Sequence, residues 1–302
     1  MAIPGFDNLS VWGVAKRSVK DFMDDDMSTY AAALTYRVLL AIFPFLLFLL
    51  TLLGALGIQN FFDWLLEQAQ SAFPDDLYSM VERIVNQVQG GANGGLLSIG
   101  LLTALWAASG GIRSAMHALN VAYDVKEERP IWKKYPLSLV FTIGLAVLLI
   151  AAVALMFLGP QVVEGIAEPL GLGDAFVTAW TWLRIPVAIL LMMVALAVIY
   201  YFFPNVDQPF QFVSPGSVIA VLAWILATIG FAFYINNFAN YNATYGSLGG
   251  VIILLLYIYI SSAVLLLGAE INGVIYKATH GAEEENVDEG AAAEAQREAQ
   301  PA

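Results

Sequence analysis

Few side chains in this sequence have the types and spacing that catalysis needs. The chain contains two histidines, His117 and His280, and no cysteine. Neither histidine belongs to an H-x-x-x-H or H-x-E pattern, so the sequence provides neither a nucleophile with its base nor a set of metal ligands. The acidic run Asp24-Asp25-Asp26 would not gather around one ion in a helix, because successive helical side chains point about 100° apart. We therefore predict no catalytic residue, no metal and no cofactor.

Ionisable residues inside apolar stretches carry more information, because charge at membrane depth is costly and usually faces protein or water. They are Arg37, Arg113, Arg184 and Glu270. At 1.5 Å per helical residue, Arg37 and Glu270 lie about 10 Å deep on the same side of the membrane, and Arg113 lies in the same half. Two interpretations stay open: Glu270 pairs with Arg37 or Arg113, or each side chain extends separately to the interface. Arg184 lies near the end of a stretch and can extend outward.

Small residues and prolines define a second set of positions. They are Pro44, Ser109, Gly110, Gly111, Pro186 and Gly268. Small residues let helix backbones approach closely within a membrane, so helix packing is the first interpretation. Prolines inside apolar stretches can kink or break a helix, and broken helices often flank transport sites.

Six apolar stretches must position these residues. They cover roughly 30–57, 95–119, 137–158, 177–203, 218–235 and 248–275. Each is long enough to cross a bilayer, since about 20 residues suffice. The 302 residues are 59% hydrophobic and 13% charged, whereas soluble domains carry about 25% charged residues. The sequence predicts an all-α integral membrane protein, a bundle of six transmembrane helices with short amphipathic helices outside the spans.

The basic residues predict how this bundle is oriented. Nine lysines and arginines lie on one side of the predicted spans: Lys16, Arg17, Lys20, Lys126, Arg129, Lys133, Lys134, Lys277 and Arg297. Only Arg83 and Arg184 lie on the other side. Because bases gather in the cytoplasmic loops of membrane proteins, we predict a multi-pass protein of the cytoplasmic membrane with both termini in the cytoplasm.

Three segments lie outside the six-span domain, which we place at 30–276. Residues 1–29 contain an amphipathic helix, 9–22, expected to lie in the membrane interface, and the acidic run at 24–26 is the solvated start of the first span. The outer loop 58–94 should form a helical cap. The tail 277–302 is expected to be disordered or a loose helix: its part after residue 280 has seven acids and one base, half of the net charge of −12. This acidic balance excludes a nucleic-acid partner.

Three ordered blocks resemble the YihY/virulence factor BrkB family, whose older members were labelled ribonuclease BN. The first is AAALTY at 31–36 followed by Phe43-Pro44. The second is LWAASGG at 105–111 with ALNVAY at 118–123 and Glu128-Arg129. The third is NYNATYGSLGG at 240–250, ending in LGAEIN at 267–272, which contains Glu270 and Asn272. We add Asn272 to the candidate polar cluster of Arg37, Arg113 and Glu270 on this basis.

The resemblance implies a helical protein of the inner or plasma membrane, for which transport of a small solute or a lipid-related molecule has been proposed. We predict a non-enzymatic membrane protein that transports or exports a small polar solute or an envelope lipid. The alternative is a structural or envelope-integrity component that acts through partners. Ribonuclease activity is disfavoured, because the chain lacks a metal site and a basic RNA surface. The expected partners are membrane lipid and a small-molecule or lipid substrate, and the sequence predicts no oligomeric state.

Overall fold

The computed structural model describes residues 10–55, 94–157, 173–238 and 248–298, with single residues and pairs between 62 and 86. This part of the chain is all-helical, which confirms the all-α part of the predicted fold class. A short helix, α1 (Val11–Asp24), precedes six long ones: α2 (Met27–Ala55), α5 (Gly94–Ala122), α6 (Ile131–Phe157), α8 (Gly173–Phe202), α9 (Pro215–Phe238) and α11 (Leu248–Glu298). Most of the predicted outer helical cap, 58–94, lies outside the described residues.

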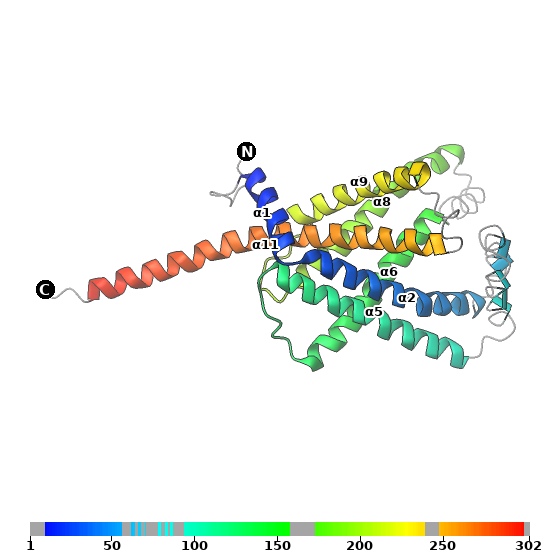
Figure 1. The fold of residues 1–302 in the computed structure, drawn as a ribbon, viewed down its shortest axis with the longest axis horizontal. Coiled ribbons are helices and arrows are strands. Elements are labelled where there is room, and N and C mark those ends of the chain that lie inside the picture. The colour runs from blue at the N-terminus through cyan, green and yellow to red at the C-terminus, as the bar shows by residue number, and fades with distance from the viewer. Residues whose placement is uncertain are drawn as a thin grey trace.

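The long helices alternate in direction along the bundle (Figure 1). α2 leads away from α1, α5 returns, and α6, α8, α9 and α11 repeat this alternation, so α1 and the end of α11 lie at the same end of the molecule. We call this the α1 end. The segments that carry the predicted cytoplasmic bases, including the loop between α5 and α6, gather there. The arrangement agrees with an even number of crossings, while the six spans and the cytoplasmic placement of the termini remain predictions.

Four of the described helices contain stretches long and apolar enough to cross a membrane. They are Ile131–Ala152, Thr178–Phe202, Pro215–Ile235 and Gly249–Thr279. α2 contributes a shorter described apolar stretch, Met27–Ile42. Large apolar side chains such as Trp182, Leu226 and Ile229 are exposed on the outside of the bundle, as expected for helices that are solvated by lipid.

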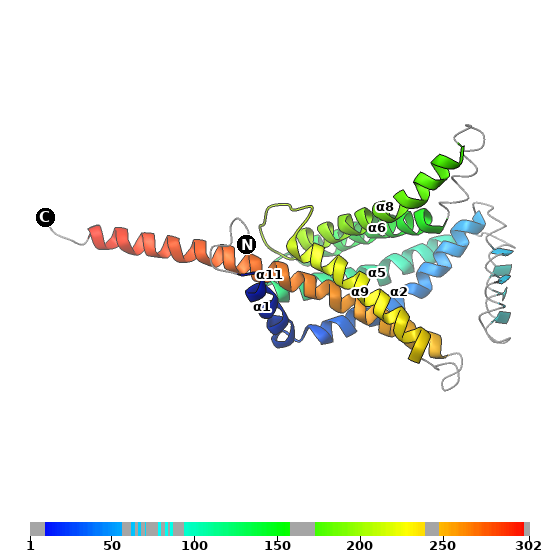
Figure 2. The same cartoon turned by 90° about the horizontal axis from the view of Figure 1, so that it is seen from above.

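The buried core lies at the α1 end of the bundle. Its members come from the first half of α2, the last turns of α5 and α8, Phe141 of α6, the first turns of α9 and the middle of α11, with Met116, Leu119 and Leu266 fully buried. At the opposite end α8 diverges from α9 and α11 (Figure 2). Among the described side chains, therefore, the closest packing surrounds the end that also carries most of the charges.

Helix starts at the α1 end follow local capping rules. Ser10 caps α1 by accepting a hydrogen bond from the Gly13 N–H at 3.0 Å. α9 begins with Pro215, a residue suited to the first helical position. Ser214 and Ser217 then exchange hydrogen bonds, from the Ser214 N–H to the Ser217 hydroxyl at 3.0 Å and from the Ser217 N–H to the Ser214 hydroxyl at 3.1 Å. This reciprocal pair satisfies N–H groups that a helix start leaves open.

α1 and the acidic run differ in detail from the sequence prediction. Val11 and Val19, two apolar residues of the predicted amphipathic helix, are exposed, whereas Ser18 is buried against the bundle. An exposed apolar stripe is compatible with a helix lying in the membrane interface, which stays a prediction. Asp24 ends α1 rather than starting the first span, and Asp26 takes a positive φ of 52° in the turn before α2.

The tail was expected to be disordered or a loose helix, and in the structure it has a helical form. α11 runs as one helix through the bundle and on to Glu298 (Figure 1). Alanine and glutamate are strong helix formers, and both are frequent after residue 280. Local propensity therefore extends α11 beyond the part that packing supports.

Candidate functional site

Glu270 is the most unusual polar residue of the described chain. It lies on α11, its side chain is fully buried, and both carboxylate oxygens lack a hydrogen-bond partner within the described residues. Buried polar groups are nearly always hydrogen-bonded, and an isolated buried charge is costly. A carboxylate at this position either carries a proton or meets a cation.

A cluster of charged residues lies at the α1 end near Glu270. Lys277, two helical turns further along α11, contacts the Asp124 carboxylate at 2.6 Å and the Asp21 carboxylate at 3.6 Å. Asp25, in the turn between α1 and α2, lies near enough to Glu270 for an electrostatic interaction. Burial, and next the Asp124 carboxylate, raise the pKa of Asp25. Three aspartates and one lysine thus surround Glu270 at this end of the bundle.

Asn272 connects α11 to the start of α9. Its side-chain oxygen accepts a hydrogen bond from the Gly216 N–H at 2.9 Å, and its amide donates to the Ser214 hydroxyl at 3.0 Å. Both contacts are buried. The predicted polar residue therefore acts as a tertiary cap, since it satisfies an N–H group in the first turn of α9.

Gly268 lies at a close crossing of helices α8, α9 and α11. A Cβ added at Gly268 would collide with the Tyr200 hydroxyl and would lie 2.9 Å from both the Ala220 Cβ and the Gly216 carbonyl oxygen. A Cβ at Gly216 would likewise collide with the Gly268 carbonyl. The Tyr200 hydroxyl donates to the Leu265 carbonyl at 2.8 Å, which fixes the crossing. Gly216 is part of this contact although the sequence analysis did not select it.

Ser109, Gly110 and Gly111 place α5 against α2. The Arg37 side chain lies beside both glycines, with its Nη1 atom 3.2 Å from the position of a Gly110 Cβ. Ser109 is buried, donates to the Trp106 carbonyl at 2.8 Å and accepts a hydrogen bond from Arg113 at 2.9 Å.

The structure brings Arg37 and Arg113 together but connects neither to Glu270. Both guanidinium groups approach Gly110, whereas the charged groups around Glu270 come from α1, the α1–α2 turn, the end of α5 and Lys277. Within the described chain no ion pair joins Glu270 to either arginine. Equal depth was correct grounds for comparing these residues, but it does not determine which face of a helix each occupies.

The other predicted positions have simpler surroundings. α2 continues as a helix through Pro44, and α8 continues through Pro186. Arg184 is half-buried in α8, and its Nε atom has no partner among the described residues. His117 is exposed, and its ring lies 5.6 Å from the Tyr30 ring in an edge arrangement.

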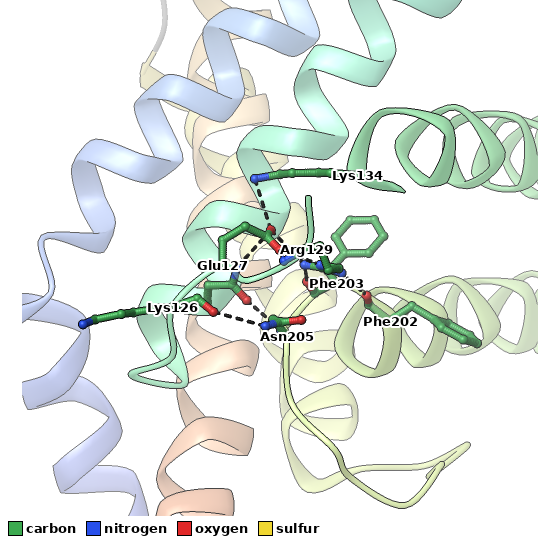
Figure 3. Close-up of polar contacts among 8 residues, drawn as sticks. Lys126, Glu127, Arg129, Lys134, Phe202, Phe203 and Asn205 are labelled. Carbon is green, nitrogen blue, oxygen red and sulfur yellow. Dashed lines mark hydrogen bonds and ion pairs between the residues drawn. The ribbon is translucent and has the colours of Figure 1, made fainter. Parts of the chain in front are cut away.

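The sequence analysis missed a polar clamp that fixes the loop between α5 and α6 (Figure 3). Glu127 accepts hydrogen bonds from the Arg129 Nε at 2.6 Å and Nη2 at 3.0 Å, and lies 3.1 Å from the Lys134 ammonium. Arg129 also donates to the carbonyl oxygens of Phe202 at 3.1 Å and Phe203 at 2.7 Å, at the end of α8. The clamp thus joins two loops and satisfies carbonyl groups that a helix end leaves open.

Asn120 and Asn205 complete this clamp. The Asn205 N–H donates to the Asn120 side-chain oxygen at 2.7 Å, and the Asn205 amide donates to the Lys126 carbonyl at 3.2 Å. The Asn120 amide donates to Glu127 at 3.3 Å. One signal for this clamp was available in the sequence. Glu127 lies in a loop that carries several lysines and arginines, and an acid in such a loop can pair with the bases around it.

Apolar helices, an apolar exterior and charges gathered at one end define a helical membrane protein. Residues 18–294 match the family model described as Virulence factor BrkB. The chain therefore belongs to this family, which confirms the resemblance drawn from the three sequence blocks.

Individual relatives cover most of the chain. The putative ribonuclease-like protein YfkH of Bacillus subtilis is 37% identical over 247 residues, which are 82% of this chain and 89% of that protein. A UPF0761 membrane protein of Alteromonas mediterranea is 27% identical over 254 residues, 83% of this chain and 84% of that protein. The UPF0761 membrane protein RSc1559 of Ralstonia nicotianae is 26% identical over 250 residues, and the chain spans 55% of its length. No solved structure was found to match.

Proposed function

We propose that this membrane protein is a gradient-driven transporter or exporter of a small polar solute or an envelope lipid, and that Glu270 is the group that takes up and releases a proton. The observation that supports the proposal most is the buried Glu270 carboxylate, whose oxygens have no hydrogen-bond partner among the described residues. An ionisable residue inside a membrane protein suggests an ion or proton pathway.

The surroundings of Glu270 support a proton route rather than a metal site. The described residues contain no group of three or more metal-ligating side chains. The proposed route leads from Glu270 to the carboxyl groups of Asp25, Asp21 and Asp124 at the α1 end, which interact with Glu270 electrostatically. We place this end in the cytoplasm, because the predicted spans have their bases there.

Proton uptake by proteoliposomes tests this function. Purified protein is reconstituted with a pH-sensitive dye inside the vesicles, a pH gradient is imposed, and small polar solutes and envelope lipids are added in turn. We expect an added substrate to start proton movement in wild type, and Glu270→Gln to abolish it. Glu128→Gln is the matched control, because Glu128 is exposed in the neighbouring loop and its change should leave the movement intact.

Two results would contradict the proposal. If correctly folded wild-type protein moves no solute, lipid or proton, the function is structural and the transporter proposal is wrong. If Glu270→Gln transports as well as wild type, the protein is a transporter but Glu270 does not carry its proton.

A further inference from the structure

Arg113 is half-buried between α5 and α6, and neutral groups hold its side chain. Its Nη1 atom donates to the Ser109 hydroxyl at 2.9 Å and to the Ser138 hydroxyl at 3.1 Å. Its guanidinium carbon lies 4.3 Å from the centre of the Tyr135 ring. These contacts orient the guanidinium group without neutralising it, because hydroxyls and aromatic rings carry no net charge.

Arg37 brings a second positive charge to the same place from α2. The Arg37 Nη1 and Arg113 Nη2 atoms lie 3.2 and 3.7 Å from the position that a Gly110 Cβ would occupy. Since both atoms lie within 4 Å of one point, they are within about 7 Å of each other, where like charges repel unless an anion offsets them. In the described part of the chain, neither arginine forms an ion pair with a carboxylate.

The arginine pair faces the outside of the bundle. Arg37 is exposed, and so are its neighbour Tyr36 and the aromatic residues beside Arg113. The Trp106 side chain, whose ring centre lies 5.8 Å from the Arg113 guanidinium, is 65% exposed, and Tyr135 is 40% exposed. Tryptophan and tyrosine are typical of the level of lipid headgroups. A partner therefore reaches the arginines from the surrounding lipid.

We propose that Arg37 and Arg113 together bind the phosphate of an anionic phospholipid from the surrounding leaflet. Guanidinium groups match phosphate oxygens in geometry and charge, and basic pockets between transmembrane helices bind anionic headgroups. Gly110 has no side chain, which lets both guanidinium groups approach its backbone. The lipid site does not depend on the proposed transport function. A lipid bound there can serve either as a transported substrate or as a structural partner.

Native mass spectrometry of the full-length protein in detergent tests the site. Phosphatidylglycerol and phosphatidylcholine are titrated separately, and the dissociation constants of the first bound lipid are compared. We expect wild type to bind phosphatidylglycerol about tenfold or more tightly than phosphatidylcholine, which corresponds to one charge-assisted contact. The double variant Arg37→Gln with Arg113→Gln should bind both lipids equally. Arg184→Gln, the same change in another apolar helix, should keep the wild-type ratio.

Several outcomes would overturn the lipid site. Equal binding of the two lipids by wild type would overturn the lipid site, and this result does not depend on the folding of any variant. A double variant that keeps the preference would place the lipid elsewhere. Complete displacement of phosphatidylglycerol by millimolar inorganic phosphate would indicate a site for free phosphate instead. If the double glutamine variant does not fold, Arg37→Lys with Arg113→Lys replaces it; because lysine keeps the charge without the bidentate geometry, its preference should fall severalfold, and an unchanged preference would refute the site.

Discussion

Glu127 provides the sharpest test of how the loops at the α1 end are held. Its carboxylate accepts a hydrogen bond from Arg129 and pairs with the Lys134 ammonium (Figure 3). It also accepts a hydrogen bond from the Asn120 amide at 3.3 Å. The substitution Glu127→Gln keeps the size of the side chain and removes the charge. It should weaken every one of these contacts while leaving the apolar helices unchanged.

The pKa of Glu127 sets the size of the effect. Burial alone would raise the pKa, but hydrogen bonds from Arg129 and Lys134 outweigh it and lower the pKa from 4.5 to about 2. Each pKa unit corresponds to about 1.4 kcal/mol, so the charged contacts stabilise the fold by about 3 kcal/mol at most. The Glu127 side chain is 17% exposed, and solvent screening reduces this value, so we expect Glu127→Gln to cost about 1–3 kcal/mol.

The pH dependence has a definite sign. Because folding lowers the pKa of Glu127, its contribution is complete above the unfolded pKa and is lost as pH falls from about 4.5 to about 2. Thermal unfolding followed by tryptophan fluorescence in detergent micelles measures this loss. At pH 7 the variant should unfold roughly 2–10 °C below wild type, and the difference should shrink at pH 3.

Glu128→Gln is the matched control, since Glu128 is the exposed neighbour of Glu127. Its unfolding temperature should stay within about 1 °C of wild type, as expected for an exposed charge. The reasoning is refuted if Glu127→Gln unfolds at the wild-type temperature at pH 7. It is also refuted if the difference between variant and wild type is the same at pH 7 and pH 3.

Two further predictions concern α11. Gly268→Val should abolish folded yield in gel filtration, because its Cβ would collide with the Tyr200 hydroxyl; Gly250→Val, where no atom lies within 4 Å of the added Cβ, should give near-normal yield, and equal yields would contradict the close crossing. Asn272→Ala should lower the free energy of unfolding in detergent by about 1–3 kcal/mol, because the buried Gly216 N–H loses its acceptor. A loss below about 0.5 kcal/mol would mean that water replaces the amide.

The presence of the long helices could be predicted from the sequence. An apolar stretch of bilayer length must satisfy its backbone hydrogen bonds within the membrane, and a helix is one of the few structures that do so. Which face of each helix is buried could not be predicted. Counting residues gives the depth of Arg37, Arg113 and Glu270, but rotation about each helix axis is set by packing against neighbours. Apolar spans in lipid show little difference between their faces, so periodicity does not reveal which side of α5 or α11 is buried.

The clamp around Glu127 was missed for a different reason. The basic residues of its loop were used to predict orientation, which depends on their number and not on their partners. The contacts of Arg129 with the Phe202 and Phe203 carbonyls join positions 73 and 74 residues apart. Tertiary folding creates such contacts, and no local pattern in either segment indicates them.

The polar residues of α11 differ in whether they have partners in the fold. The fold supplies two buried hydrogen-bond partners to Asn272 and two carboxylates to Lys277, so this part of the helix has polar groups within reach. Glu270, between them and the close crossing at Gly268, receives no hydrogen bond from the described chain. A glutamine or an apolar residue would cost less there if packing were the only constraint. The absence of a described partner for Glu270 is therefore the reason why we propose a role in proton transfer for this residue and a packing role for Asn272.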